Sequence, residues 1–112
     1  MPQKPQIDSL RGRTVRWTFN DGPTAGTTYE HRFDEDGTIG FRGVDKSAKG
    51  GFTRTKQGTV MKLGDGYFVV SYLSESGFTL TTVLDTRRME MVGFASNESS
   101  WFQQTGTFEL VD

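Results

Sequence analysis

His31 is the side chain in this sequence best suited to proton transfer, because imidazole titrates near neutral pH. Glu30, Asp34 and Asp85 are the carboxylates that could accompany it in acid–base chemistry. Adjacent residues of a strand point to opposite faces, so Glu30 cannot simply orient His31. We therefore interpret His31 as a residue that either contacts a ligand or is satisfied within a core.

Three arginines are the charged residues most relevant to binding: Arg16, Arg42 and Arg54. A guanidinium that points into a core requires an acidic partner or an anionic ligand, and Glu30 is a candidate partner. If Arg42 or Arg54 faced the mouth of a cavity, it could hold a ligand carboxylate through two parallel hydrogen bonds. The alternative is a surface arginine whose stem covers apolar neighbours.

Several other chemistries are excluded by residue types that are absent or isolated. The chain has no cysteine and a single histidine, which excludes thiolate sites, disulfides and multi-histidine metal sites. Ser71, Ser74 and Ser76 lack the context of a nucleophile elbow. Residues 34–37 resemble the start of a calcium loop without its remaining ligands, and we interpret them as a charged turn. We expect no metal and no cofactor.

Length and charge indicate one domain of 112 residues, with 13 basic and 14 acidic side chains and a net charge of -1. This balance offers no general attraction to nucleic acid or to anionic membranes. The first ten residues lack the apolar stretch of a signal peptide, and the longest apolar run, Tyr67–Val70, is far shorter than the ~20 residues of a membrane helix. We expect a cytoplasmic protein with neither nucleic acid nor membrane as partner.

The elements that must position these residues are strands. The 14 glycines recur together with Asp, Asn and Ser at intervals of about ten residues, which is typical of all-β sandwiches and barrels. Residues 1–11 are expected to form a leader or cap, and residues 12–112 a single β-barrel domain. The predicted strands cover residues 13–20, 27–34, 38–44, 51–57, 59–63, 67–73, 78–85, 89–96 and 100–111.

An antiparallel meander of eight to nine strands exposes its edges unless it closes into a barrel, so we predict an all-β barrel. A barrel of this size has room for packed side chains or for one small ligand. The segment Tyr67–Leu73 is apolar on both faces, which predicts that something covers its outer face. Either the leader or a second subunit could do so, and we favour a homodimer.

Large aromatic residues would decide what the barrel holds, because binding pockets are mostly apolar with a few orienting polar groups. Trp17, Tyr29, His31, Tyr72 and Trp101 supply such a mixture, although they could also simply fill the core. The predicted ligand is small and hydrophobic or aromatic. The candidate ligand-binding residues are Trp17, Phe19, Tyr29, His31, Arg54, Tyr72 and Trp101.

The segment Thr27–Arg42, TTYEHRFDEDGTIGFR, resembles a hairpin of two related groups, the phenolic acid decarboxylases and the MoaF-like proteins, named for molybdenum cofactor biosynthesis protein F. Both groups have calycin or lipocalin-like barrels, so the resemblance implies that fold. Its order of motifs runs from about Gly12 to Gly106. The further shared motifs are Gly50-Gly51, Gly64–Tyr72, Ser76-Gly77 and Val83-Leu84-Asp85. The strand ending Leu84-Asp85 and the strand segment Met91–Phe94 are more similar to the MoaF-like group than to the decarboxylases.

The decarboxylase resemblance implies two tyrosines on the first strand that hold the substrate carboxylate. Trp17 and Phe19 occupy those positions and lack the phenolic hydroxyls. The decarboxylases also have an arginine directly after the Gly-Gly pair, where this chain has Phe52. The nearest arginine is Arg54, two residues further on.

The third decarboxylase role is a glutamate two residues after the aromatic that matches Tyr72. Ser74 stands there, and Glu75 is one residue out of register, which points a strand side chain to the other face unless a bulge intervenes. The three roles are missing or displaced, so the resemblance does not carry this decarboxylation mechanism over.

Three hypotheses follow for function. The first is a MoaF-like barrel that binds a partly aromatic or carboxylated metabolite. The alternative is a lyase or isomerase acting on such a molecule, with His31, Tyr29 or Glu75 as acid–base groups. A third is a structural dimer with a filled core. The MoaF-like group brings no settled activity, and we assign no catalytic residue from the sequence.

Overall fold

The computed structural model describes residues 9–44, 53–55, 58–74 and 77–111 of the chain. All nine segments predicted to be strands contain strands, and the described residues form no helix. The strands are β1 (Thr14–Phe19), β2 (Thr28–Phe33), β3 (Ile39–Gly43), β4 (Thr53–Thr55), β5 (Gly58–Gly64), β6 (Tyr67–Leu73), β7 (Thr79–Asp85), β8 (Glu90–Ser96) and β9 (Trp101–Leu110).

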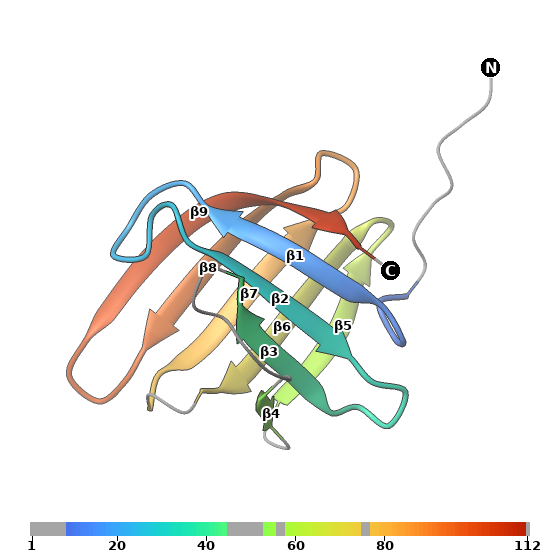
Figure 1. The fold of residues 1–112 in the computed structure, drawn as a ribbon, viewed down its shortest axis with the longest axis horizontal. Coiled ribbons are helices and arrows are strands. Elements are labelled where there is room, and N and C mark those ends of the chain that lie inside the picture. Colours follow the sequence, from blue (N-terminus) through green and yellow to red (C-terminus); the bar gives the residue numbers. More distant parts are fainter. Residues whose placement is uncertain (1–8, 45–52, 56–57, 75–76, 112) are drawn as a thin grey trace.

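These strands form one antiparallel sheet in the order β4-β3-β2-β1-β9-β8-β7-β6-β5. The sheet curls, so that β1, β2 and β3 lie in front of β6, β7 and β8 and cross them at a steep angle (Figure 1). The predicted all-β, lipocalin-like barrel is thereby confirmed. The sheet has two edge strands, β4 and β5, and no backbone pairing between them occurs among the described residues.

Alternation along each strand decides what lies inside, because successive side chains point to opposite faces. On β1, Val15 and Trp17 are buried, whereas Arg16 and Thr18 between and after them remain partly exposed. The same alternation runs along β6, where the buried residues are Phe68, Val70 and Tyr72. The period-two pattern of the sequence therefore specifies the inner face of the barrel.

The barrel is filled with apolar side chains at the end where β1 begins and β2 ends. Leu10, in the turn that precedes β1, is buried in this core. The turn is fixed by hydrogen bonds from Gly12 N to Phe33 O (2.6 Å) and from Arg13 N to Leu10 O (2.9 Å). Leu10 is therefore part of the core at this end. The buried core consists of Leu10, Val15, Trp17, Phe33, Ile39, Phe68, Val70, Tyr72, Leu84, Met91 and Phe108.

Gly106 on β9 permits an unusually close approach between β9 and β1. It lies opposite Phe19 on β1 and opposite Met91 on β8. A Cβ atom at position 106 would overlap the carbonyl oxygen of Thr18 and would lie 2.6 Å from Met91 Cε. Glycine within a strand marks such close backbone contacts. Only a residue without a side chain fits at this point of the barrel.

The outer face of β5 and β6 carries exposed apolar side chains, as the double-sided pattern of Tyr67–Leu73 predicted. Met61, Leu63, Tyr67 and Leu73 are all exposed, with Leu63 at 58% of its full accessibility. The homodimer that we expect from this face stays a prediction.

Candidate ligand-binding site

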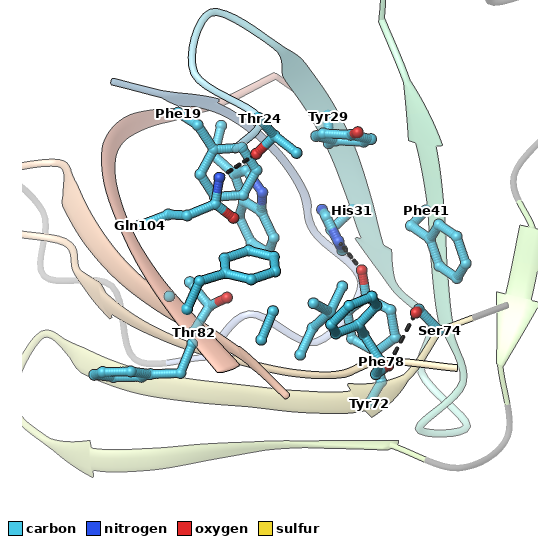
Figure 2. A pocket seen from close by; sticks show the side chains of 16 residues that line it. Phe19, Thr24, Tyr29, His31, Phe41, Tyr72, Ser74, Phe78, Thr82 and Gln104 are labelled. Atoms are coloured by element: carbon cyan, nitrogen blue, oxygen red, sulfur yellow. Dashed lines mark hydrogen bonds between the residues drawn. The ribbon is translucent and has the colours of Figure 1, made fainter. Parts of the chain in front are cut away.

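A cavity of about 390 Å³ lies within the barrel, beside the filled core. Its volume is near the lower end of the range of small-molecule sites, about 300–1,000 Å³. Aromatic rings supply most of the wall, and they converge on the cavity from both halves of the sheet (Figure 2). The aromatic lining residues, apart from Phe94, whose ring contacts Trp101 on the outer face, are Trp17, Phe19, Tyr29, His31, Phe41, Tyr72, Phe78 and Phe102.

Strand register brings the rings of β1, β2 and β3 together. Trp17 lies directly opposite Tyr29, and His31 lies directly opposite Phe41. Residues opposite each other in an antiparallel pair point to the same face, with Cβ atoms about 5 Å apart. Each of these aromatic pairs is therefore positioned by the backbone pairing, before any contact with the far wall.

His31 makes the central contacts of this wall. Its imidazole stacks on the indole of Trp17 with ring centroids 3.7 Å apart and an interplanar angle of 25°. Its Nε2 atom forms a 2.8 Å hydrogen bond with the hydroxyl of Tyr72, which reaches it from β6 across the interior (Figure 2). The ring of Tyr72 stacks in turn on Phe41, at 5.1 Å between centroids. These four rings form one connected cluster.

Burial keeps both titratable members of this cluster, His31 and Tyr72, uncharged. Burial lowers the pKa of His31 to about 3, because a protonated imidazole would lose its hydration there. For the same reason burial raises the pKa of the Tyr72 phenol well above its ordinary value. At neutral pH the site therefore presents a neutral imidazole and a neutral phenol.

Two ring nitrogens in this wall lack a hydrogen-bond partner among the described residues. They are Trp17 Nε1 and His31 Nδ1, and both side chains are 2% exposed. Leaving a buried donor or acceptor unpaired costs about 1–3 kcal/mol, and native structures contain few such groups. Both nitrogens belong to residues that line the cavity, but neither atom itself has accessible surface within it.

The loop between β1 and β2 is fastened to β9 at the edge of the cavity. Asp21 accepts hydrogen bonds from the Thr105 backbone N–H (2.7 Å) and from the Thr105 hydroxyl (2.6 Å). These hydrogen bonds lower the pKa of Asp21. Gln104, which lines the cavity, donates from Nε2 to the hydroxyl of Thr24 on the same loop (Figure 2).

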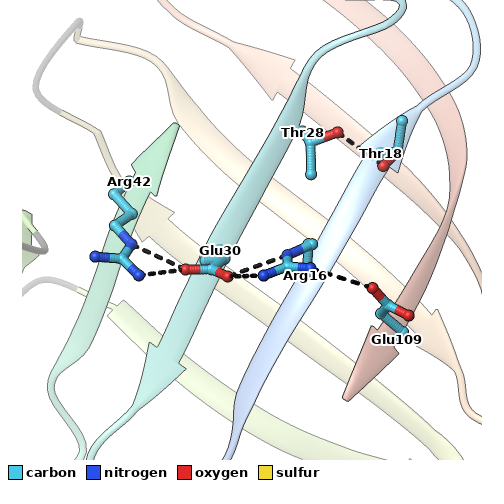
Figure 3. Close-up of polar contacts among 6 residues, drawn as sticks. All are labelled: Arg16, Thr18, Thr28, Glu30, Arg42 and Glu109. Carbon is cyan, nitrogen blue, oxygen red and sulfur yellow. Dashed lines mark hydrogen bonds and ion pairs between the residues drawn. The ribbon is translucent and has the colours of Figure 1, made fainter. Parts of the chain in front are cut away.

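A row of alternating charges crosses the outer face of four neighbouring strands (Figure 3). Arg16 lies opposite both Glu30 and Glu109, and Glu30 lies opposite Arg42. The closest N–O distances from Glu30 are 2.7 Å to Arg16 and 2.7 Å to Arg42, and Arg16 lies 3.5 Å from Glu109. We call these four residues the charge row. Glu30 is thus the acidic partner of Arg16 and Arg42, as the sequence suggested.

Glu30 is buried beneath its two partners, with a side-chain exposure of 5%. Burial alone would raise its pKa, but the hydrogen bonds and charges of Arg16 and Arg42 outweigh burial and lower it. Arg42 therefore belongs to the charge row on the outer face of the sheet. Among the described lining residues of the cavity, none carries a charge at neutral pH.

Residues 3–99 match the model of the MoaF N-terminal domain. The chain belongs to this family. The resemblance to MoaF-like proteins, which the motifs from Gly12 to Gly106 suggested, is confirmed. The match ends before β9, which nevertheless joins β1 to β8 in the sheet of this MoaF domain and supplies Phe102 and Gln104 to the cavity wall.

One solved structure similar to this MoaF domain is a crystal structure of a candidate beta-lactamase from Burkholderia vietnamiensis. The two chains share 15% of their residues, with a TM-score of 0.73 over 98% of this chain and 100% of the other. At this identity the likeness concerns the fold. None of the curated proteins matches this chain in sequence.

Five of the seven sequence-predicted site residues line the cavity of the MoaF domain: Trp17, Phe19, Tyr29, His31 and Tyr72. They were predicted from strand alternation and aromatic character. The structure brings them together from β1, β2 and β6.

Trp101 was placed wrongly. It is 65% exposed and contacts the ring of Phe94 at 6.2 Å between centroids. On β9 the cavity-lining residues are Phe102 and Gln104, and alternation turns Trp101 to the opposite, outer face. The predicted strand was right, but the wrong one of its two faces was assigned to the interior.

Arg54 pairs through its backbone with Gly40, and its side chain lies outside the described part of the structure. Glu75, the acid–base candidate of the enzyme hypothesis, also lies outside the described residues.

The sequence reasoning missed several apolar wall residues and one amide. Register could have identified Phe41, which lies opposite His31, and Leu80, which lies opposite Tyr72. Phe78 and Phe102 contact each other edge-to-face from different strand ends, which no local pattern indicates.

Within residues 9–44, 53–55, 58–74 and 77–111, no group of three metal-binding side chains comes together. No helix suited to crossing a membrane was found among them either.

Proposed function

We propose that this MoaF domain binds a small, partly aromatic molecule inside its barrel. The observation that carries the proposal is a cavity of about 390 Å³ walled by aromatic rings. Protein interiors are close-packed, and voids larger than a water molecule are few in a domain. A bound molecule with one or two rings would recover the contacts that the wall lacks on its inner side.

The site favours binding over acid–base catalysis. An efficient general acid or base has a pKa near the working pH. Burial moves the pKa of His31 to about 3 and raises that of Tyr72, so both groups titrate far from neutrality. The lyase or isomerase alternative would therefore rely on groups beyond these two.

Thermal shift with a simple probe tests the proposal, because a ligand that binds only the native form raises Tm. We choose 4-phenyl-2-butanone, a neutral aromatic ketone with one ring and a short chain. We expect a dose-dependent rise in Tm for the native chain. No rise up to millimolar concentration would contradict the proposal.

Ala95→Leu supplies the matched control. Ala95 lines the cavity and is buried, so a larger apolar side chain there fills part of the space. We expect this variant to fold and to lose the probe response. An equal response in both proteins would place the probe elsewhere and contradict the proposed site.

Incubation with p-coumarate separates binding from the decarboxylase mechanism. We expect no release of carbon dioxide, because Trp17 and Phe19 stand where that mechanism requires tyrosines. Sustained release that depends on the folded chain would favour the enzyme alternative.

A further inference from the structure

Thr82 on β7 and Gln104 on β9 are two polar residues in the largely aromatic wall of the cavity. Both residues line the cavity, and both are only 5% exposed. Strand register places them in one row across the sheet, since Thr82 lies opposite Gly93 and Gly93 lies opposite Gln104. Because Gly93 has no side chain, no member of this row stands between the two polar groups.

Each of these residues has a side-chain oxygen without a hydrogen-bond partner among the described residues. Gln104 donates from Nε2 to the Thr24 hydroxyl and to the carbonyl oxygen of Asp21, the latter at 3.4 Å. A backbone carbonyl can only accept, so the amide nitrogen faces Asp21 and the amide oxygen, Oε1, lies on the other side. The Thr82 hydroxyl makes no hydrogen bond with a described side chain or backbone group.

Both oxygens remain accessible. Among the described residues, the buried polar atoms that lack both a partner and accessible surface are ring nitrogens of Trp17 and His31, and neither oxygen is among them. Figure 2 shows the Gln104 oxygen and the Thr82 hydroxyl directed toward the interior of the barrel. A Cβ atom at position 93 would lie 3.3 Å from Thr82 Oγ1, so Gly93 keeps this hydroxyl open. A molecule in the cavity can therefore reach both oxygens.

The two oxygens differ in what they require of a ligand. An amide oxygen only accepts hydrogen bonds, whereas a hydroxyl donates or accepts. A ligand group that only accepts can bind the Thr82 hydroxyl, but it leaves Gln104 Oε1 buried without a partner, which is unfavourable. A hydroxyl or an N–H group donates to Gln104 Oε1, so no polar atom of the pair is left unpaired on that account.

We infer that the ligand carries a hydrogen-bond donor, a hydroxyl or an N–H group, that binds Gln104 Oε1 beside the Thr82 hydroxyl. This inference rests on the proposed function and specifies the polar group of its partly aromatic ligand.

Three probes with the same carbon skeleton test the inference. 4-Phenyl-2-butanol carries a hydroxyl, 4-phenyl-2-butanone carries a carbonyl that only accepts, and butylbenzene has no polar group. We expect the native chain to bind the better enantiomer of the alcohol at least about fivefold more tightly than the ketone, measured by isothermal titration calorimetry. Equal affinities, or a preference for the ketone, would overturn the inference.

Gln104→Met removes the acceptor and keeps a side chain of similar length. The loop between β1 and β2 remains fastened by the hydrogen bonds between Asp21 and Thr105. We expect the affinities for the alcohol and the ketone to become equal within about twofold in this variant. A preference for the alcohol that persists in full would contradict the assignment to Gln104.

Thr82→Val replaces the hydroxyl by a methyl group, and Thr82→Ser retains the hydroxyl. We expect Thr82→Val to weaken alcohol binding about fivefold and to leave butylbenzene binding nearly unchanged, whereas Thr82→Ser keeps most of the affinity for the alcohol. Without ligand, Thr82→Val should be at least as stable in urea as the native chain, because it loses no internal hydrogen bond. Equal losses for both probes, or a marked loss of stability, would contradict the inference.

The comparison of probes on the native chain tests the inference even if a variant fails to fold. If none of the three probes binds, the proposed function itself fails. If they bind without a preference for the alcohol over the ketone, the proposed function stands and the inference fails.

Discussion

Tyr72 on β6 and His31 on β2 are hydrogen-bonded across the inside of the barrel, with 2.8 Å between the hydroxyl oxygen and Nε2. β2 and β6 are not neighbours in the sheet order. The bond therefore connects the two halves of the sheet through the interior, in addition to the backbone pairing around the wall. It also holds the imidazole at one end of the proposed binding site.

Tyr72→Phe removes this connection and leaves His31 Nε2 buried without a partner. We expect the free energy of unfolding to fall by about 1–3 kcal/mol, measured by urea denaturation. Tyr29→Phe is the matched control, because the Tyr29 hydroxyl makes no hydrogen bond with a described residue although its ring lines the same cavity. Equal losses in the two variants would show that the hydrogen bond contributes nothing specific.

Stability should depend on pH through His31, whose pKa burial lowers to about 3 from 6.5. Between these values the unfolded chain binds a proton that the folded chain does not, so acidification favours unfolding. The free energy of unfolding should decrease from about pH 6.5 downward by up to about 1.4 kcal/mol per pH unit. Above this window His31 contributes no pH dependence.

His31→Gln should abolish that slope between about pH 6.5 and pH 5, where carboxylates with ordinary or lowered pKa remain ionised. The chain has one histidine, so no other histidine titrates in this window. Urea denaturation at several pH values measures the slope. Retention of the full slope in the variant would contradict the assignment to His31.

Glu30→Gln interrupts the charge row at its buried member. We expect a loss of about 1–2 kcal/mol, between the values for exposed and fully buried pairs, because the two arginines are about 40% exposed and can return to water. Glu109→Gln is the control. Glu109 is 64% exposed, and its loss should cost about 0.5 kcal/mol or less. A larger effect at Glu109 than at Glu30 would refute this ranking.

Gly106→Ala should destabilise the barrel by about 2 kcal/mol or more, because the added methyl group overlaps the Thr18 carbonyl and crowds Met91. Gly64→Ala serves for comparison, since a Cβ atom at Gly64 meets nothing within 4 Å. Thermal unfolding of both variants tests the difference. A tolerated Gly106→Ala would mean that β1 and β9 separate more easily than their packing indicates.

The fold could be predicted from the sequence because its determinants are local. Alternation in segments such as Arg13–Asn20 gives the strands, and turn residues such as Asp65-Gly66 give the hairpins. Gly66 has the positive φ of 84° that this turn requires. The strand order follows largely from the meander, in which most neighbours along the chain also pair.

The site could be predicted only in part, because its wall depends on register and on contacts across the barrel. Alternation indicates that His31 and Tyr29 share a face, but the hydrogen bond to Tyr72 joins residues 41 positions apart. At Trp101, alternation alone does not decide which face of the strand lies inside. Both faces of β9 carry aromatic residues there, and one step along the strand decides between the cavity and the outer surface.

The charge row also bears on how the strands find their partners during folding. If β2 slipped by two residues against β1, the same faces would stay inward, but Arg16 would face either Arg32 or Thr28 instead of Glu30. Like charges directly opposite each other are unfavourable, and Glu30 would lose Arg16, one of its two cationic partners. Hydrophobic alternation rejects odd shifts of the ribbon, and the outer charges penalise even ones. The correct alignment is therefore selected twice, once from each side of the wall.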